Sequence, residues 1–143
     1  MEIKIKYHNK NIDKIEKIPT GDWIDLRCSE TTILKQGDYK LIPLGVSIQL
    51  PEGYEAHVAP RSSTFKKWGI IQTNSIGIID ESYKGNDDQW MMPVLAMRDT
   101  IIEENDRICQ FRIFNKMPSL LHITVVENLD NPNRQGFGST GIK

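Results

Sequence analysis

The sequence predicts an all-β protein of jelly-roll type, built as a sandwich or barrel of short strands. Apolar residues alternate with polar ones in many short runs, such as residues 107–114, and this period is typical of half-buried strands. Turn-forming Gly, Pro, Asn and Asp residues separate the runs. No segment shows the period of a long helix, and no internal repeat or second domain is apparent.

Composition restricts the class of protein. A chain of 143 residues suits one domain with a core, and a hydrophobic content of 38% leaves oligomerisation open. The net charge of −1 gives no broad basic surface for nucleic acid. The longest apolar run is too short to span a membrane, and the alternating, charged N-terminus predicts a strand and not a signal peptide. We therefore expect a cytoplasmic protein.

The first half of the chain is predicted to alternate strands with turns. Residues 2–7 place Ile between Lys, which predicts an edge strand. A helical turn at residues 65–68 is expected to end at Gly69. The predicted strands are the end of segment 21–28 and residues 40–50 and 54–59, with loops at residues 11–17 and 29–39 and tight turns at residues 37–38 and 51–53.

The second half is predicted to continue the same pattern. A hairpin begins at residues 70–71, and Pro93 indicates a sheet edge or bulge within the strand at residues 90–97. Further strands are expected at residues 100–103, 107–114 and 119–127. The domain is therefore predicted to span residues 1–128, followed by a mobile arm at residues 129–143 that is rich in Asn, Gly and Pro.

The segment NSIGIIDESYKG, residues 74–85, is the main candidate for chemistry. Asp80 follows the β-branched pair Ile78 and Ile79 directly, and Tyr83 lies three residues further on. A carboxylate on a rigid element beside an aromatic ring is a plausible catalytic geometry. The alternative is a hairpin with a turn-capping Asp and a surface Tyr.

Other segments carry groups that suit a phosphate. In APRSST, Arg61 offers a planar fork of donors, and Ser62 and Ser63 add hydroxyls, although a polar turn is the alternative. Asp25 lies within a predicted strand and needs a partner such as an Arg or a metal-bound water, and a structural salt bridge is the alternative to a role in a site. Gln110 lies mid-strand and either satisfies a neighbouring backbone group or orients a water or phosphate. The tail, RQGFGSTG, is either a disordered end or a flap whose ring stacks on a base.

Cysteine and histidine show no metal-binding pattern. Cys28 and Cys109 follow no metal or disulfide spacing, and we expect reduced, buried thiols. The three histidines are scattered, without a ligand pair or a triad. An oxygen-ligand metal such as Mg²⁺, bridging phosphates, is therefore favoured over zinc.

In this order, the segments resemble the five motifs of the homotrimeric dUTP pyrophosphatases (dUTPases), most closely those of short bacterial and phage members. GDWIDLRC is similar to the first motif, APRSST to the second, NSIGIIDESYKG to the third, NDRICQFRI to the fourth and RQGFGSTG to the fifth. The chain departs from the family pattern in lacking Ala-Gly before the aromatic-Asp pair of motif one. In motif five, its Arg stands closer to the Phe than is usual.

The resemblance implies a distorted jelly-roll barrel (a β-clip) with a flexible C-terminal arm, in a homotrimer with active sites at subunit interfaces. It implies hydrolysis of dUTP to dUMP and pyrophosphate with Mg²⁺ held by substrate phosphates and water, without a direct protein ligand. This reaction keeps uracil out of DNA and supplies dUMP. No nucleic acid or membrane partner is expected.

The resemblance also assigns roles to residues. Asp80 is the general base for the attacking water, and Asp25 belongs to a supporting acidic network. Trp90 covers the base or sugar, or else lies in the core. The substrate-binding set comprises Asn74, Gly77 and Ile79 at uracil, Tyr83 at the deoxyribose, Arg61, Ser62, Ser63 and Gln110 at phosphates of a neighbouring chain, and Arg134, Phe137, Gly138, Ser139 and Thr140 in the arm.

Two alternatives remain at this point. A dCTP deaminase shares the fold, but its members tend to carry Trp where Tyr83 stands, and they use a catalytic Glu that this chain does not obviously supply. A non-catalytic jelly-roll that binds a nucleotide or a protein is disfavoured because Asp80, Arg61, Gln110 and the arm motif occur together.

Overall fold

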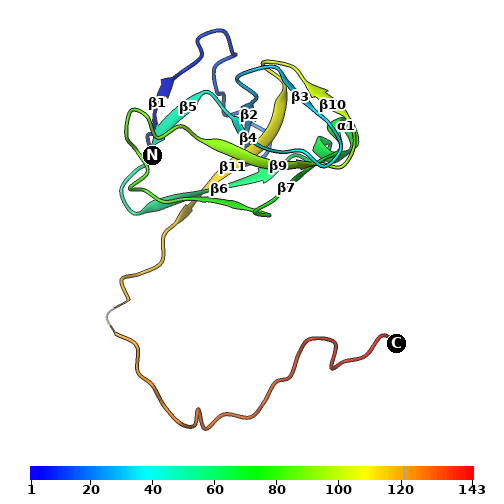
Figure 1. Ribbon diagram of the computed structural model, residues 1–143. Coiled ribbons are helices and arrows are strands. Elements are labelled where there is room, and N and C mark those ends of the chain that lie inside the picture. Colours follow the sequence, from blue (N-terminus) through cyan, green and yellow to red (C-terminus); the bar gives the residue numbers. More distant parts are fainter. Residues whose placement is uncertain (121) are drawn as a thin grey trace.

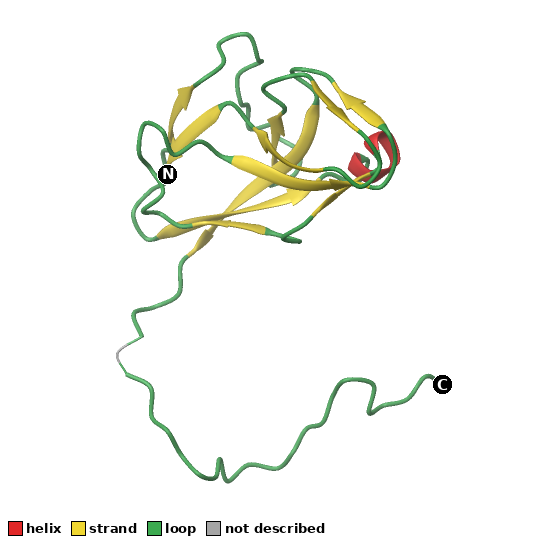
Figure 2. Ribbon diagram, in the orientation of Figure 1, coloured by secondary structure: helices red, strands yellow, loops and turns green. Residues whose placement is uncertain are grey.

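The computed structural model describes residues 1–120 and 122–143, and it consists of a β domain followed by an extended arm (Figures 1 and 2). The predicted all-β class is confirmed. The elements in chain order are β1 (Lys4–Tyr7), β2 (Ile24–Arg27), β3 (Thr32–Leu34), β4 (Tyr39–Pro43), β5 (Val46–Gln49), β6 (Tyr54–Pro60), α1 (Thr64–Trp68), β7 (Ile70–Gln72), β8 (Gly77–Ile79), β9 (Met91–Ala96), β10 (Thr100–Ile102) and β11 (Arg107–Asn115).

Antiparallel sheets enclose one hydrophobic core. One sheet has the order β2-β11-β6-β8 and another the order β4-β9-β7, while β1 pairs with β5 and β3 with β10. Trp90 meets Phe111 edge to face at 5.2 Å in this core, and both are fully buried. Strand β11 alternates as predicted, so the buried Phe111 points inward and Gln110 lies on the outer face. That outer face carries part of the candidate site.

Some boundaries differ from the prediction. The single strand expected at residues 40–50 is divided into β4 and β5, because Gly45 adopts a φ of 74° that interrupts the extended backbone. The expected loop at residues 29–39 contains β3, which pairs with β10. The helical turn is confirmed: Gly69 has a φ of 63° and donates its N–H to the Phe65 carbonyl at 2.7 Å.

The prediction for Pro93 is wrong, because β9 is the central strand of its sheet. Pro93 pairs with Leu41 of β4 on one side, and its carbonyl accepts the Thr73 N–H at 3.0 Å on the other. In an antiparallel strand the nitrogen and carbonyl of one residue point to the same side, so the Pro93 nitrogen faces the β7 side. The last pair there is Gln72 with Val94, so Pro93 stands at the end of β7, where its missing N–H removes only the bond that would face Thr73.

The last predicted strand, residues 119–127, is not formed by the described residues of that segment, and Leu121 lies outside them. After β11 the chain leaves the domain and runs away from it (Figure 1). Strand pairing needs a neighbouring edge, and this extended segment has none beside it in the single chain. The division between domain and arm at residue 128 stays a prediction.

Burial accounts for the state of the two thiols. Cys28 and Cys109 are free and fully buried, as predicted. Desolvation raises the pKa of both, so neither is poised as a thiolate. Separately, no helix among the described residues has the length and apolar character needed to cross a membrane.

Candidate active site

The hairpin segment forms one wall of a cavity of about 430 Å³. Strand β8 ends at Ile79, so Asp80 emerges at the rim, and the turn after it brings Tyr83 to the same cavity. Asn74, at the tip before β8, lines the same cavity. Three residues that the sequence singled out are thus brought together.

Asp80 is held as an ionised carboxylate. Its Oδ2 accepts hydrogen bonds from the Ser82 hydroxyl at 2.5 Å and from the Ser82 backbone N–H at 2.8 Å. These bonds, the hydroxyl's first, lower the pKa of Asp80 below its ordinary value. The other oxygen, Oδ1, has no hydrogen bond within the described residues and remains available to a ligand or water.

Replacing Ser82 with Ala is expected to raise the pKa of Asp80 toward its ordinary value of 3.8, because the largest stabilising hydrogen bond is removed. A carboxyl-detected NMR titration measures this shift, and Asp80 protonates at higher pH in the variant. Ser82→Thr keeps a hydroxyl and is the matched control. An unchanged midpoint in Ser82→Ala would show that the hydroxyl does not control this carboxylate.

Tyr83 is fixed in place at the cavity. Its hydroxyl donates to the Gln89 carbonyl at 2.9 Å, and its backbone N–H donates to the Asp80 carbonyl at 3.0 Å. The ring therefore has a defined position beside the carboxylate. Trp90 also lines this cavity, but its side chain is fully buried in the core, so it forms a floor and does not cover a ligand from outside.

A loop contact fixes the far side of the hairpin segment. Glu81 accepts the Gly53 backbone N–H at 2.6 Å and pairs with Lys116. The Lys116 contact, followed by the Gly53 hydrogen bond, lowers the pKa of Glu81. This clamp joins the loop that carries Asp80 to Lys116, the residue that follows β11.

A second cavity, of about 400 Å³, gathers the residues predicted for phosphate. Arg61, Ser62 and Gln110 line it together with Asp25. Asp25 pairs with Arg61 Nε at 3.0 Å and with Arg107 at 3.3 Å, so each carboxylate oxygen faces one guanidinium. The side-chain N–H of Gln110 (Nε2) donates to the Pro60 carbonyl at 3.1 Å, so the side-chain oxygen Oε1 takes no part in that hydrogen bond.

Arg61 is positioned by the buried Thr64. The backbone N–H of Arg61 donates to Thr64 Oγ1 at 2.8 Å, and the Thr64 hydroxyl donates to the Ile108 carbonyl at 2.9 Å. Thr64 is fully buried, which ties the APRSST turn to β11. Ser63 is half-buried at the start of α1 and does not line the cavity that Ser62 lines.

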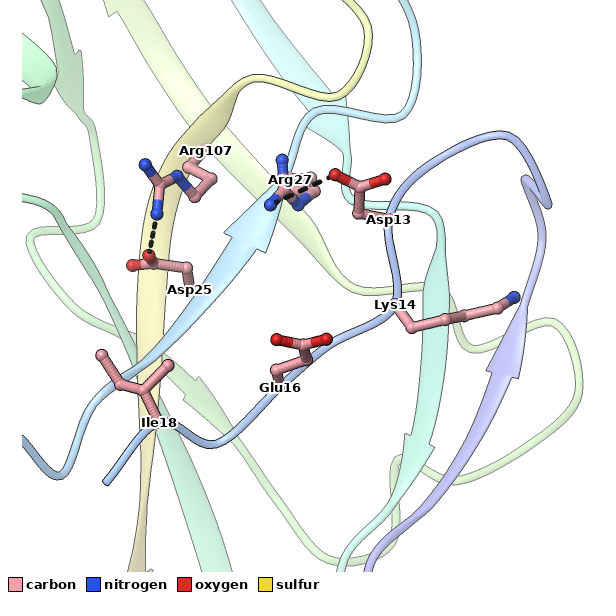
Figure 3. A pocket seen from close by; sticks show the side chains of 7 residues that line it. All are labelled: Asp13, Lys14, Glu16, Ile18, Asp25, Arg27 and Arg107. Atoms are coloured by element: carbon pink, nitrogen blue, oxygen red, sulfur yellow. Dashed lines mark hydrogen bonds and ion pairs between the residues drawn. The ribbon is translucent and has the colours of Figure 1, made fainter. Parts of the chain in front are cut away.

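Asp25 also borders a third cavity, of about 310 Å³, on its other side (Figure 3). There, Arg107 points toward Asp25, and Arg27 pairs with Asp13 at 3.5 Å. Asp25 thus lines two cavities, and it pairs with Arg61 in one and with Arg107 in the other. Sequence reasoning offered Asp25 an Arg partner but not Arg107, because that contact joins residues far apart in the chain.

The residues around Asp80 and the residues around Arg61 do not share a cavity in one chain. The Asp80 cavity and the Arg61 cavity have no lining residue in common. The arm residues Arg134 and Phe137 are exposed and line neither of these cavities. The groups that were assigned to one site therefore line separate cavities within a single chain.

The donor set indicates how a metal would be accommodated. Within residues 1–120 and 122–143, no group of three or more His, Cys, Asp or Glu side chains is arranged to hold a metal ion. Asp25 already faces two guanidinium groups. The carboxylates therefore suit a cation that arrives with other oxygen ligands, such as phosphates and water.

Three contributors escaped the sequence reasoning. Ser82 had a local signal, because a Ser two residues after an Asp is typical of a side-chain-stabilised turn. Thr64 was part of the APRSST segment, but its partner on β11 lies far along the chain. Arg107 stood in the NDRICQFRI segment, where nothing local distinguished it from a solvated arginine.

Comparison with known proteins gives a consistent result. A family model described as dUTPase matches residues 2–141. The chain is 57% identical over 143 residues, 100% of both chains, to the SPbeta prophage-derived deoxyuridine 5'-triphosphate nucleotidohydrolase YosS of Bacillus subtilis (strain 168).

Solved structures show the same fold. The Staphylococcus bacteriophage 80alpha dUTPase with dUPNHPP matches with a TM-score of 0.78 at 21% identity, over 99% of both chains. A mutant dUTPase from phage phi11 of S. aureus, in which a structural Mg(II) ion is coordinated, matches with a TM-score of 0.77 at 18% identity, over 92% of this chain and 100% of that one. The jelly-roll type of the fold is thereby confirmed.

Proposed function

Because the chain belongs to the dUTPase family, we propose that it hydrolyses dUTP to dUMP and pyrophosphate, with Asp80 as the general base. The observation that carries this role is the Asp80 carboxylate, whose pKa is lowered by its Ser82 contacts and which lies in one cavity with Asn74 and Tyr83. The reaction keeps uracil out of DNA and supplies dUMP. The prophage origin of the relative supports a cytoplasmic location.

Asp80 takes a proton from a water molecule as the oxygen of that water attacks the α-phosphorus of dUTP. The P–O bond between the α- and β-phosphates breaks, and the electron pair leaves with pyrophosphate. Such in-line displacement needs a positioned water and neutralised phosphates, and little covalent help from the protein. A general base contributes about 10²–10⁴-fold to such a rate.

The hairpin reads the base and sugar in this proposal. Asn74 and the backbone at Gly77 and Ile79 face uracil, whose hydrogen-bonding edge has the reverse polarity of that of cytosine. A mispaired buried polar group costs about 1–3 kcal/mol, so the hairpin is expected to bind uracil in preference to cytosine. Tyr83, fixed by Gln89, packs on the deoxyribose and leaves no room for a 2′-hydroxyl.

The phosphates are bound by another copy of the chain. Arg61, Ser62, Ser63 and Gln110 face them from the neighbouring subunit, and Asp25 orients the Arg61 guanidinium. The arm then closes with Phe137 over the base and Arg134, Gly138, Ser139 and Thr140 at the triphosphate. This requires the homotrimer, and the separation of the two cavities within one chain supports it.

The side chains of this chain suit an Mg²⁺ ion that would be held by the substrate phosphates and water. The Asp25 carboxylate is occupied by two arginines, which fits a cation held by phosphate oxygens and water and not by protein ligands. When bound, the ion supplies neutralisation of the phosphate charge. The residues of the chain supply the base, the guanidinium groups and the binding surfaces.

A pyrophosphate-release screen over dUTP, dCTP, dTTP and UTP with Mg²⁺ tests the proposal. We expect release from dUTP and at least about a tenfold lower kcat/KM for each of the others, because each mispairs or clashes at one polar or steric point. Ammonia release from dCTP would instead identify a deaminase. Binding without any product would identify a non-catalytic nucleotide-binding protein.

A further inference from the structure

Gln72 is a buried polar residue directly behind the hairpin tip. It ends β7 and is only 4% exposed. Its Nε2 donates to the Val58 carbonyl at 2.9 Å and to Asn74 Oδ1 at 2.9 Å. Its own Oε1 has no hydrogen-bond partner within the described residues. Because buried polar atoms are usually hydrogen-bonded, the burial of this amide calls for another explanation.

The network has a fixed polarity. A backbone carbonyl can only accept, so the Val58 carbonyl requires the NH₂ end of the Gln72 amide. The second hydrogen of that NH₂ group then requires an acceptor, which selects the oxygen end of Asn74. The Asn74 amide is consequently turned with its oxygen inward, and its NH₂ group remains for the cavity.

The surroundings hold this arrangement in place. Gly77 lies against both amides: a Cβ there would stand 3.6 Å from Asn74 Nδ2 and 3.8 Å from Gln72 Nε2. The Asn74 carbonyl accepts the Ile76 N–H at 2.6 Å, and Ser75 takes a φ of 62° to close the tip. Asn74 thus has a fixed backbone and one side-chain partner, and it lines the cavity that contains Asp80.

We propose that Gln72 is a positioning residue that sets which end of the Asn74 amide faces the ligand, and that it thereby selects pyrimidines with a carbonyl at the 4-position. The NH₂ group of Asn74 donates to such a carbonyl and opposes the 4-amino group of cytosine, which is also a donor. This selection rests on the proposed binding of deoxyuridine nucleotides at the hairpin.

Gln72→Met keeps the approximate length of the side chain and removes both donors. The Asn74 amide then rotates freely, and the preference for dUMP over dCMP, measured as the ratio of calorimetric dissociation constants, falls about tenfold. The same fall is expected in the ratio of kcat/KM for dUTP over dCTP. Gln72→Glu, whose carboxylate accepts from the Asn74 NH₂ group, turns the amide over and lowers the preference at least as far.

A double-mutant cycle separates positioning from a general structural effect. In an Asn74→Ala background, Gln72→Met is expected to leave the remaining preference unchanged, because the residue acts only through Asn74. A fall of equal size in that background, or an unchanged preference in both Gln72 single variants, overturns the proposal. Circular dichroism verifies folding, and Gln72→Glu serves if Gln72→Met does not fold.

The binding readout keeps the two proposals distinguishable. If the wild-type protein releases no pyrophosphate from dUTP but Gln72→Met lowers its preference for dUMP, the proposed hydrolysis fails and the role of Gln72 stands. If hydrolysis is specific for dUTP and the Gln72 variants keep the full preference, the reverse holds.

Discussion

Asp80→Asn is expected to lower the rate of pyrophosphate release from dUTP by about 10²–10⁴-fold while nucleotide binding survives. The amide keeps the size and most hydrogen bonds of the carboxylate but cannot take the proton of the attacking water. Asp80 is exposed, and its partners are atoms of Ser82, so the fold does not depend on its charge. Single-turnover kinetics and calorimetric titration with a non-hydrolysable dUTP analogue measure the two properties separately.

Asp87→Asn is the matched control for this variant. Asp87 is an exposed carboxylate in the same region of the chain, and it lines neither the Asp80 cavity nor the Arg61 cavity. We expect it to retain the wild-type rate. An unchanged rate in Asp80→Asn would remove the assignment of the base, whereas loss of nucleotide binding would reassign Asp80 to substrate binding.

Removal of residues 133–143 is expected to leave the trimer intact and to reduce turnover by roughly 10²-fold or more, because the closing arm no longer orders the triphosphate. The exposed ring of Phe137 and the lack of arm contacts with either cavity support a role that begins only with ligand. Size-exclusion chromatography with light scattering measures assembly, and steady-state kinetics measures turnover.

A shorter truncation provides the control. Removing residues 142–143 keeps the segment up to Gly141, where the dUTPase family match ends, and is expected to keep full activity. Mixing arm-deleted subunits with Asp80→Asn subunits tests whether groups combine across chains, because mixed trimers recover activity if arm and base come from different copies. Dissociation of the arm-deleted protein into monomers would contradict the separation of arm and domain.

Local sequence patterns were sufficient to predict much of the fold. The alternation of residues 107–114 predicted β11, and the Gly69 signal predicted the end of α1. Pro93 was misplaced because sequence alone does not reveal where a partner strand stops. The strand at residues 119–127 has the composition of a strand, but pairing depends on an edge that one chain does not provide.

The site was predicted in part for a related reason. The residues of the hairpin are close in sequence, so Asp80 and Tyr83 were found together. The grouping of Asp25, Arg61 and Gln110 in one cavity followed only from the family resemblance, since strand pairing across β2, β6 and β11 creates it. The Gln72 contact had no signal in the pattern, because its meaning lies in the direction of two hydrogen bonds.

The extended segment after β11 has a consequence for biogenesis. Ile123, Val125 and Val126 are all exposed there, and β-branched residues in a row are prone to pair with any open strand edge. In the proposed trimer, a newly synthesised subunit would carry this segment unprotected until it meets its partners. Assembly therefore competes with aggregation, and the yield of folded protein is expected to depend on how quickly subunits find one another after leaving the ribosome.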